Sequence, residues 1–499
     1  MFRATFTACV SPAGNQPIHN VLALKPRFHV SCGDYFYNDS QAVYTINGYT
    51  MNPTIFWDYV VTPNGAPVNA HSAAYMLTRY EKHFGRTGLL PYRLFHAARD
   101  RGELLHYMQA DDHDNVANNW DHSLAIFKAD FPISTNAAYG QIVNDAAFTQ
   151  AQALQAWDLG QAGNLAIETA YSDNPPRGPA NGDIPSAMVG TATADHYATK
   201  YFYRDFGPAG ELGGNCVRFI FPDGISYKNP ASDADTSAKH FWGPKQAAWI
   251  LDTAQDAVNK GFGMCVVFST KDLFNLDNGD GPWSYATRRD ELLQAIHDRN
   301  LPVVWMCGDK HVPHADIARV SNGRPYDCLS LCPTPAGQGM GNMTQNIESV
   351  WYTNRNDTCV FGLVEVDDIA RTVTLSVCDL FSLDTLFSAT VPFGSRLPSK
   401  ITTNVGQTFA PTQSPIRQAP AIGASPFAYQ NATNRPQLVV MKGGTVSLVE
   451  YSNDNTTYDD TGQSKGQFVV LPGHWLRITY SVAPTLFAVY PFAYPQTVQ

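Results

Sequence analysis

The sequence lacks the features that mark a membrane protein or a nucleic-acid-binding protein. No apolar stretch approaches the roughly 20 residues that a membrane-spanning helix requires. The 34 Lys and Arg residues form no run, and the 44 Asp and Glu residues give a net charge of −10. Dispersed negative charge disfavours contact with nucleic-acid phosphates or an anionic bilayer. We therefore expect a folded protein with no membrane segment and no strong nucleic-acid surface.

Export signals and metal-finger cysteines are also missing. The N-terminus enters a strand-like alternation at once, without twin arginines or an apolar signal region, so we expect no export signal and a cytoplasmic location. The nine cysteines lack the short paired spacing of a metal finger. Cys216, Cys265 and Cys307 lie in apolar runs, which predicts buried free thiols.

Length and composition predict more than one domain. A chain of 499 residues with 44% apolar residues exceeds what one core usually holds. Residues 1–397 read as an α/β domain, and residues 398–425, rich in Pro, Thr, Ser, Gln and Ala, read as a linker. Residues 426–499 contain five short strand patterns separated by turn residues, which predicts a small β-sandwich module.

The first domain alternates strand and helix patterns. We expect strands at residues 3–10, 27–32, 199–206, 216–222, 264–269, 360–366 and 372–377, and another beginning at residue 303. Helical spacing covers residues 71–84, 92–107, 145–172, 244–259 and 288–299. The turn-rich residues 41–70 read as an insertion near the mouth of a site.

An acidic stretch, Asp111-Asp112-His113-Asp114, followed by Asn118 and Asn119, is the first candidate for chemistry. Unpaired carboxylates this close together repel one another and raise one another's pKa. A bound cation relieves the repulsion, and oxygen and nitrogen donors suit hard or borderline metals. A solvated acidic loop is the alternative for this stretch taken alone.

Two Gly-Asp pairs strengthen the metal hypothesis. Asp34 and Asp309 each follow a Gly that ends an apolar, strand-like run. Gly permits a sharp turn, and side chains at the carboxyl ends of strands form the sites of α/β folds. Two such pairs, with the acidic stretch between them, predict a two-metal hydrolase.

Five short motifs together resemble the PhoD-like metallophosphatases, in the same order from residue 1 to about 395. They are Phe6-Thr7-Ala8-Cys9, Gly33-Asp34-Tyr35-Phe36-Tyr37, Asp111-Asp112-His113-Asp114 with Asn118-Asn119, Phe241-Trp242-Gly243-Pro244-Lys245-Gln246, and Gly308-Asp309-Lys310-His311. The resemblance implies a four-layer α/β/β/α metallophosphatase (calcineurin-like) sandwich. It also implies a two-metal site that hydrolyses small phosphate mono- or diesters as an alkaline phosphatase or phosphodiesterase.

The resemblance assigns the metal ligands residue by residue. Asp34 matches the aspartate that bridges the metals, and the remaining matches are Cys9, Asp111, Asp112, Asp309 and His311. The ligand tyrosine would be Tyr75 or Tyr80, and Asp280 lies near the place of a further family aspartate. Asp114 departs from the family, where Glu is common, and the expected lack of an export signal argues against periplasmic phosphate scavenging.

The implied cofactors are two or more metal ions. Iron with calcium is one arrangement known in the family, and a thiolate with a phenolate favours Fe³⁺ because anionic donors offset its charge. Zn²⁺, Mn²⁺ and Mg²⁺ are alternatives for the same ligands. Another interpretation is that the site binds only calcium, in a structural role. Cys9 and a ligand tyrosine would then have no reason to lie near the acidic residues.

Three residues are candidates for catalysis, each with a plainer alternative. His113 is placed to protonate the departing alkoxide, or it orients a ligand. Asn118 binds a metal or a phosphate oxygen, or it caps a helix. Lys310 steadies phosphate as a point charge, or it points outward.

The last residues carry a weaker resemblance. Turn motifs such as Gly443-Gly444-Thr445-Val446 and Leu471-Pro472-Gly473-His474 look like those of a small β module in phage structural proteins. This implies a phage-encoded enzyme that associates with a virion through residues 426–499; a module that aids homo-oligomerisation is the alternative. A non-catalytic structural protein with a vestigial phosphatase fold is the competing function.

Overall fold

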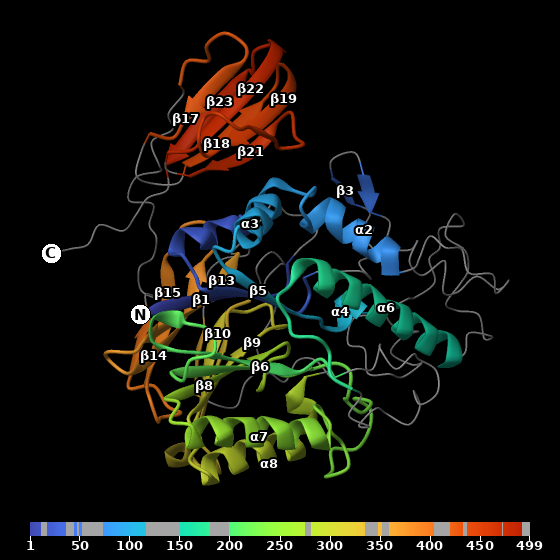
Figure 1. Ribbon diagram of the computed structural model, residues 1–499, viewed down its shortest axis with the longest axis vertical. Coiled ribbons are helices and arrows are strands. Elements are labelled where there is room, and N and C mark those ends of the chain that lie inside the picture. Colours follow the sequence, from blue (N-terminus) through green and yellow to red (C-terminus); the bar gives the residue numbers. More distant parts are fainter. Residues whose placement is uncertain are drawn as a thin grey trace.

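The computed structural model describes residues 1–10, 17–35, 44–46, 49–51, 73–115, 150–179, 199–274, 281–334, 348–351, 359–403, 420–432, 437–471 and 473–491. The described residues form a mixed α/β structure with several sheets and few helices (Figure 1). Two seven-stranded sheets make up most of it, and a smaller β module lies at one end.

The first sheet combines strands from both ends of the domain, in the order β16-β15-β14-β13-β1-β2-β5. Its parallel part is formed by β1 (Phe2–Thr7), β2 (Phe28–Cys32) and β5 (Leu105–Gln109). The antiparallel part contains β13 (Val360–Asp367), β14 (Thr372–Asp379), β15 (Thr385–Pro392) and β16 (Lys400–Thr403). The parallel strands therefore end at one edge of the sheet.

The second sheet has the order β12-β10-β11-β9-β8-β7-β6. Its parallel strands are β7 (Val217–Phe221), β8 (Met264–Ser269), β9 (Val303–Cys307) and β11 (Cys328–Cys332). Antiparallel strands complete both sides: β6 (Phe202–Phe206), β10 (His314–Ala318) and β12 (Glu348–Trp351). Strands β7, β8 and β9 are buried along their whole length, as the apolar runs of β8 and β9 predict. In β7 the buried Arg218 forms ion pairs with Asp205 and Asp256.

The two sheets pack against each other through an aromatic core. Phe28 of the first sheet meets Phe219 of the second edge-on, with ring centroids 4.8 Å apart. Phe6 stacks on Phe268 at 5.6 Å. Offset and edge-on ring pairs add to the free energy gained from apolar burial alone. This shared core fixes the ends of the two sheets relative to each other.

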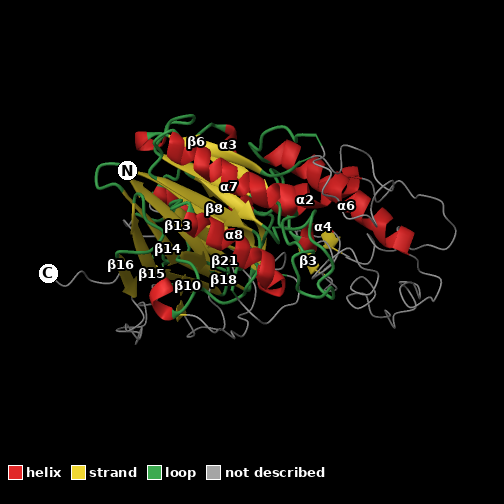
Figure 2. Ribbon diagram, turned by 90° about the horizontal axis from the view of Figure 1, so that it is seen from below, coloured by secondary structure: helices red, strands yellow, loops and turns green. Residues whose placement is uncertain are grey.

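Helices pack against strands of both sheets. On the second sheet, α7 (Pro244–Asn259) and α8 (Ala286–Asp298) bury apolar side chains in one cluster with β8 and β9. Figure 2 shows both helices from below, beside the strands. On the first sheet, Phe95 of α3 (Leu90–Asp100) contacts His29 and His106, with ring centroids 4.9 and 5.0 Å apart. Helix α2 (Ala73–Phe84) lies along α6 (Gln150–Tyr171).

Several short elements lie between these sheets and helices along the chain. They are the two-stranded β3 (Tyr44–Ile46) and β4 (Tyr49–Met51), the one-turn α4 (Asp112–Asn115), and the 3₁₀ turns η1 (Ile18–Leu24), η5 (Pro208–Gly210), η6 (Pro282–Tyr285) and η7 (Val320–Asn322). Among the described helices, none is both long enough and apolar enough to cross a membrane.

The C-terminal module is a β-sandwich with its own core. One sheet has the order β17-β22-β19-β20 and the other β21-β18-β23. The strands are β17 (Phe427–Gln430), β18 (Gln437–Lys442), β19 (Thr445–Ser452), β20 (Asp459–Asp460), β21 (Gly466–Val470), β22 (Trp475–Val482) and β23 (Leu486–Pro491). Each of the five strands expected here is present.

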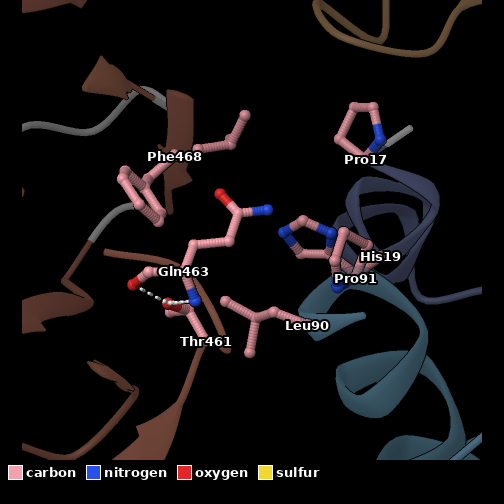
Figure 3. Close-up of a pocket in the computed structure, with 8 residues that line it drawn as sticks. Pro17, His19, Leu90, Pro91, Thr461, Gln463 and Phe468 are labelled. Atoms are coloured by element: carbon pink, nitrogen blue, oxygen red, sulfur yellow. Dashed lines mark hydrogen bonds between the residues drawn. The ribbon is translucent and has the colours of Figure 1, made fainter. Parts of the chain in front are cut away.

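The module rests on α3 of the first domain. Leu90 and Leu94 pack against the module core, and the Arg93 guanidinium donates a hydrogen bond to the Asp460 carbonyl. A small cavity of ≈ 50 Å³ remains between the two parts. Figure 3 shows His19 beside it, facing Gln463 of the module.

Two expectations about secondary structure are wrong. The helix expected over residues 92–107 ends at Asp100, because Gly102 (φ +73°) turns the chain and residues 105–109 form β5. The sheet also continues past the expected strands through β15 and β16, so Lys400–Thr403 is paired strand rather than linker. The strands expected at residues 199–206 and 216–222 are confirmed as β6 and β7, which pair antiparallel.

Candidate metal centre

The candidate ligands meet where parallel strands of both sheets end. Cys9 follows β1, Asp34 follows β2, and Asp111 follows β5 in the first sheet, while Asp309 follows β9 in the second. Backbone hydrogen bonds hold the first three loops together: the Gly33 N–H donates to the Gln109 carbonyl at 2.7 Å, and the Val10 N–H donates to the Asp34 carbonyl at 2.9 Å. Because parallel neighbours end at one edge, distant residues converge there.

The backbone is strained at this edge. Cys9, Asp34 and Asp309 adopt positive φ values of 55°, 51° and 69°. Non-glycine residues rarely adopt this region, and where they do it accompanies a site whose geometry the surroundings impose. Of these side chains, the Cys9 thiol lies against the Asp34 carboxylate, and the Asp309 carboxylate accepts a hydrogen bond from Lys271.

The glycines of the two Gly-Asp pairs are required by close packing. A Cβ on Gly33 (φ +78°) would lie 2.9 Å from the Asp111 Cβ. A Cβ on Gly308 would lie 2.7 Å from the Thr270 carbonyl oxygen and 2.9 Å from that of Cys32. Both distances are shorter than contacts between real Cβ atoms and their neighbours, so a side chain at either position would push the loops apart.

The first ligand group consists of Cys9, Asp34 and His311, whose donor atoms all lie within 4.8 Å of one another. The Cys9 Sγ is 3.5 Å from Asp34 Oδ2. Burial, followed by the negative charge of Asp34, raises the pKa of the Cys9 thiol well above its ordinary value. A buried thiol beside carboxylates becomes a thiolate only if a cation joins them, so this donor set fits a metal ion.

A second group, formed by Asp34, Asp112 and His113, shares Asp34 with the first. One carboxylate that belongs to two adjacent groups is the arrangement that a metal-bridging aspartate requires. The backbone N–H of His113 also donates to Asp112 Oδ1 at 3.0 Å, and this hydrogen bond fixes the Asp112 carboxylate at the start of α4. His113 itself is half-buried.

The third group contains a cation from the chain itself. Asp111, Asp112 and Asp309 surround the Nζ of Lys271, at 3.3, 3.1 and 2.7 Å respectively. Burial raises the pKa of Asp111 well above its ordinary value, although Lys271 opposes the rise. At Asp112 burial acts in the same direction, but Lys271 and His113 outweigh it and lower the pKa. The pKa values of the two neighbouring carboxylates are therefore shifted in opposite directions.

Lys271 is the residue that sequence analysis missed. It stands two residues after the end of β8, so the expected strand at residues 264–269 was a signal that its loop reaches the same edge. The residues around it, Ser269-Thr270-Lys271-Asp272, match neither the Gly-Asp pattern nor an acidic cluster. Only the sheet order, with β8 next to β9, places this loop beside Asp309.

The remaining predicted site residues are only partly placed. Lys310 is buried, which rules out the alternative that it points outward. Tyr80 is buried on α2 and packs against Tyr35, Phe84 and Tyr171, while the side chain of Tyr75 is outside what the structure describes. Asn118 and Asp280 also lie outside the described residues. The roles predicted for these residues stay predictions.

A fourth group, Asp272, His314 and Asp316, is also buried. The His314 Nδ1–H donates to the Val312 carbonyl at 2.7 Å, so Nε2 faces Asp272 Oδ2 at 3.1 Å and Asp316 Oδ2 at 3.3 Å. Burial alone would lower the pKa of His314, but Asp316 and Asp272 together raise it well above its ordinary value. A proton on Nε2 then serves as the positive charge between the two carboxylates.

The free thiols agree with the sequence. None of the nine cysteines forms a disulfide, and Cys216, Cys265 and Cys307 are buried as expected.

Comparison with known protein families gives no match to any family model, and comparison with curated proteins gives no match either. The chemistry of the site therefore rests on its own geometry: a soft and hard donor set joined by one shared carboxylate.

Proposed function

We propose that the protein hydrolyses phosphate esters with the help of bound metal ions. The observation that supports this most is the position of Asp34, which belongs both to the Cys9–Asp34–His311 group and to the Asp34–Asp112–His113 group. Two cations that share one carboxylate form the centre used for in-line displacement at phosphorus. The likeness of five short motifs to PhoD-like metallophosphatases supports the same reaction.

The donor types support particular metals. The Cys9 group offers sulfur, nitrogen and oxygen and suits iron, whereas the Asp112 group is richer in oxygen and also accepts calcium, manganese or magnesium. When bound, such ions supply Lewis-acid activation of the ester and of the attacking water. In this proposal the two packed sheets and their covering helices are the four-layer α/β/β/α metallophosphatase fold.

The residues of the chain perform the remaining steps. The half-buried His113 borders the shared carboxylate and can donate a proton to the departing alkoxide oxygen. Lys310 stands between Asp309 and His311 and supplies positive charge for the phosphate oxygens. Burial of Asp111 and Asp112 keeps bulk water from competing for these contacts.

Elemental analysis combined with two assays tests the proposal. Purified protein is expected to contain tightly held metal and to hydrolyse p-nitrophenyl phosphate, bis-p-nitrophenyl phosphate or both. A chelator should abolish turnover, and added metal should restore it. A folded, metal-loaded protein that turns over neither ester would instead support the non-catalytic structural role.

A further inference from the structure

The loop that carries Lys271 is held rigidly at the site. The Ser269 hydroxyl donates to the Lys271 carbonyl at 2.7 Å. Thr270 fills the space that side chains at Gly33, Gly224 and Gly308 would need. The backbone of this loop is thus clamped between loops of both sheets, and the lysine stem can extend in only a narrow range of directions.

The ammonium of Lys271 is surrounded by carboxylates. Its side chain has no solvent exposure, and Nζ lies within 3.3 Å of one oxygen from each of Asp111, Asp112 and Asp309. The ammonium donates a hydrogen bond to Asp309 Oδ1 at 2.7 Å, and the carboxylates of Asp111 and Asp112 lie within ion-pair distance of it. The three carboxylates provide oxygens only, which is the donor set that Ca²⁺ or Mg²⁺ takes in other proteins.

A metal ion and this ammonium cannot share the group. The three carboxylates lie within 4.8 Å of one another around one position, and two cations there would repel each other strongly in a buried setting. If the Lys271 ammonium moved away, the buried carboxylates would lose their counter-charge. Of the two groups that share Asp34, the Cys9–Asp34–His311 group has no residue in common with this one, and the Asp34–Asp112–His113 group shares only Asp112 with it.

We propose that the Lys271 ammonium is a built-in cation that takes the place of a metal ion at Asp111, Asp112 and Asp309, so that metal ions bind only at the groups that share Asp34. This inference rests on the proposed metal-dependent function. It differs from a plain two- or three-metal centre in one respect: part of the positive charge is covalently attached to the chain. A chelator removes the metals but leaves Asp309 and Asp112 anchored by Lys271.

Metal stoichiometry in matched variants tests the role of Lys271. Lys271→Met keeps the length of the side chain and removes its charge, and Lys271→Arg keeps the charge. We expect Lys271→Met to bind one more equivalent of Ca²⁺ or Mn²⁺ than the wild type, measured by elemental analysis after desalting. We also expect its melting temperature to rise with added Ca²⁺, because the ion restores the missing charge. Lys271→Arg should keep the wild-type stoichiometry.

Two further measurements extend the test, and the second, made on the wild type, does not depend on the folding of Lys271→Met. In the double variant Lys271→Met with Asp111→Asn, the group has less negative charge, and we expect the extra equivalent to disappear. In wild-type crystals soaked with Mn²⁺, anomalous scattering should show metal beside Asp34 and none between Asp111 and Asp309. A manganese peak at that position in the wild type, or an unchanged metal count and Ca²⁺ response in a folded Lys271→Met protein, would overturn the inference.

Failure of this inference is distinguishable from failure of the proposed function. If Lys271 is not a built-in cation, the wild type still hydrolyses esters, and only the metal stoichiometry of the wild type and of Lys271→Met departs from the values expected above. If the protein is not a phosphoesterase, the loaded wild type shows no turnover whatever its stoichiometry.

Discussion

The thiol of Cys9 lies 3.5 Å from the carboxylate of Asp34, and both side chains are buried. In a protein without metal, this contact leaves a neutral thiol beside an acid that has little water around it. Asp34 also belongs to the neighbouring group of Asp112 and His113, so its replacement affects both groups together.

Replacing Asp34 with Asn is therefore expected to release metal from both groups. Asn tolerates the positive φ of 51° at this position, so the loop should keep its shape. We expect turnover to fall by at least about a hundred-fold, since even residues that only orient ligands cost ten- to a hundred-fold. Elemental analysis and ester hydrolysis measure the two effects. Asp252→Asn, on the exposed face of α7, is the control and should change neither.

Gly33→Ala should displace the acidic loop. The added Cβ would lie 2.9 Å from the Asp111 Cβ, and the backbone has φ +78°. We expect a loss of roughly 1–3 kcal/mol of stability together with weaker metal binding. Gly102→Ala is a matched control, because its φ of +73° imposes similar strain while no atom lies within 4 Å. Equal effects in urea unfolding and metal titration would mean that strain alone, and not contact with Asp111, accounts for the result.

His113→Ala separates two roles of the imidazole. If His113 donates the proton to the leaving group, substrates with poor leaving groups should slow far more than nitrophenyl esters, by about a hundred- to ten-thousand-fold. Alkyl and nitrophenyl phosphates compared on one preparation give this ratio. Because His113 also lies in the Asp34–Asp112 group, metal content must be measured alongside. Equal slowing of both substrates, or loss of a metal, would assign His113 to metal binding or positioning.

A chain that ends at Thr403 should retain hydrolysis of a small soluble ester. Every described member of the four candidate groups precedes residue 317, and the cut leaves β16 paired with β15. The module covers Leu90 and Leu94 of α3, so we expect the truncated protein to be less soluble and to melt at a lower temperature. Leu90→Gln with Leu94→Gln in the truncated chain should restore solubility. A folded, metal-loaded truncation without activity would show that the module completes the site.

Acid should destabilise the protein through buried neutral histidines. Burial lowers the pKa of His19, His96 and His106 to about 3 each. Between that value and the ordinary 6.5 the unfolded chain binds more protons, so stability is lost as the pH falls through this window. The loss is about 2 kcal/mol per histidine at pH 5.

The His19 contribution can be isolated, because it lies where the module meets the first domain. Among the described residues neither of its ring nitrogens has a hydrogen-bond partner, and His474 of the module further lowers its pKa. His19→Gln should flatten the dependence of urea-unfolding free energy on pH between 7.5 and 5. An unchanged slope in this variant would mean that His19 stays neutral or is solvated in both states.

The sequence predicted the positions of the Gly-Asp loops because two local signals coincide there. Buried parallel strands read as continuous apolar runs, and a glycine follows where the chain must pass close to its neighbours. Asp34 and Asp309 could be assigned to one edge for that reason. The five strands of the module were likewise readable from their turn residues.

Lys271 and β5 could not be predicted in the same way. A lysine after a strand is usually solvated, and only the order of strands in the second sheet brings this one to Asp309. Residues 105–109 follow a helix after a four-residue connection, so the helical pattern extends over them in the sequence. The pairing of β5 with β2, which is a contact between distant segments, decides their structure.

The position of β1 in the first sheet bears on synthesis of the chain. β1 lies between β2 and β13, and Phe2 pairs with Val366. At about 5–20 residues per second, the ribosome needs roughly 20–70 seconds to deliver that partner. During this interval one long edge of the nascent β1–β2–β5 sheet stays open, and Asp111 and Asp112 await the arrival of Lys271. The order of synthesis thus leaves the N-terminal half with an unpaired strand edge, which is a template for aggregation, until the last strands of the sheet arrive.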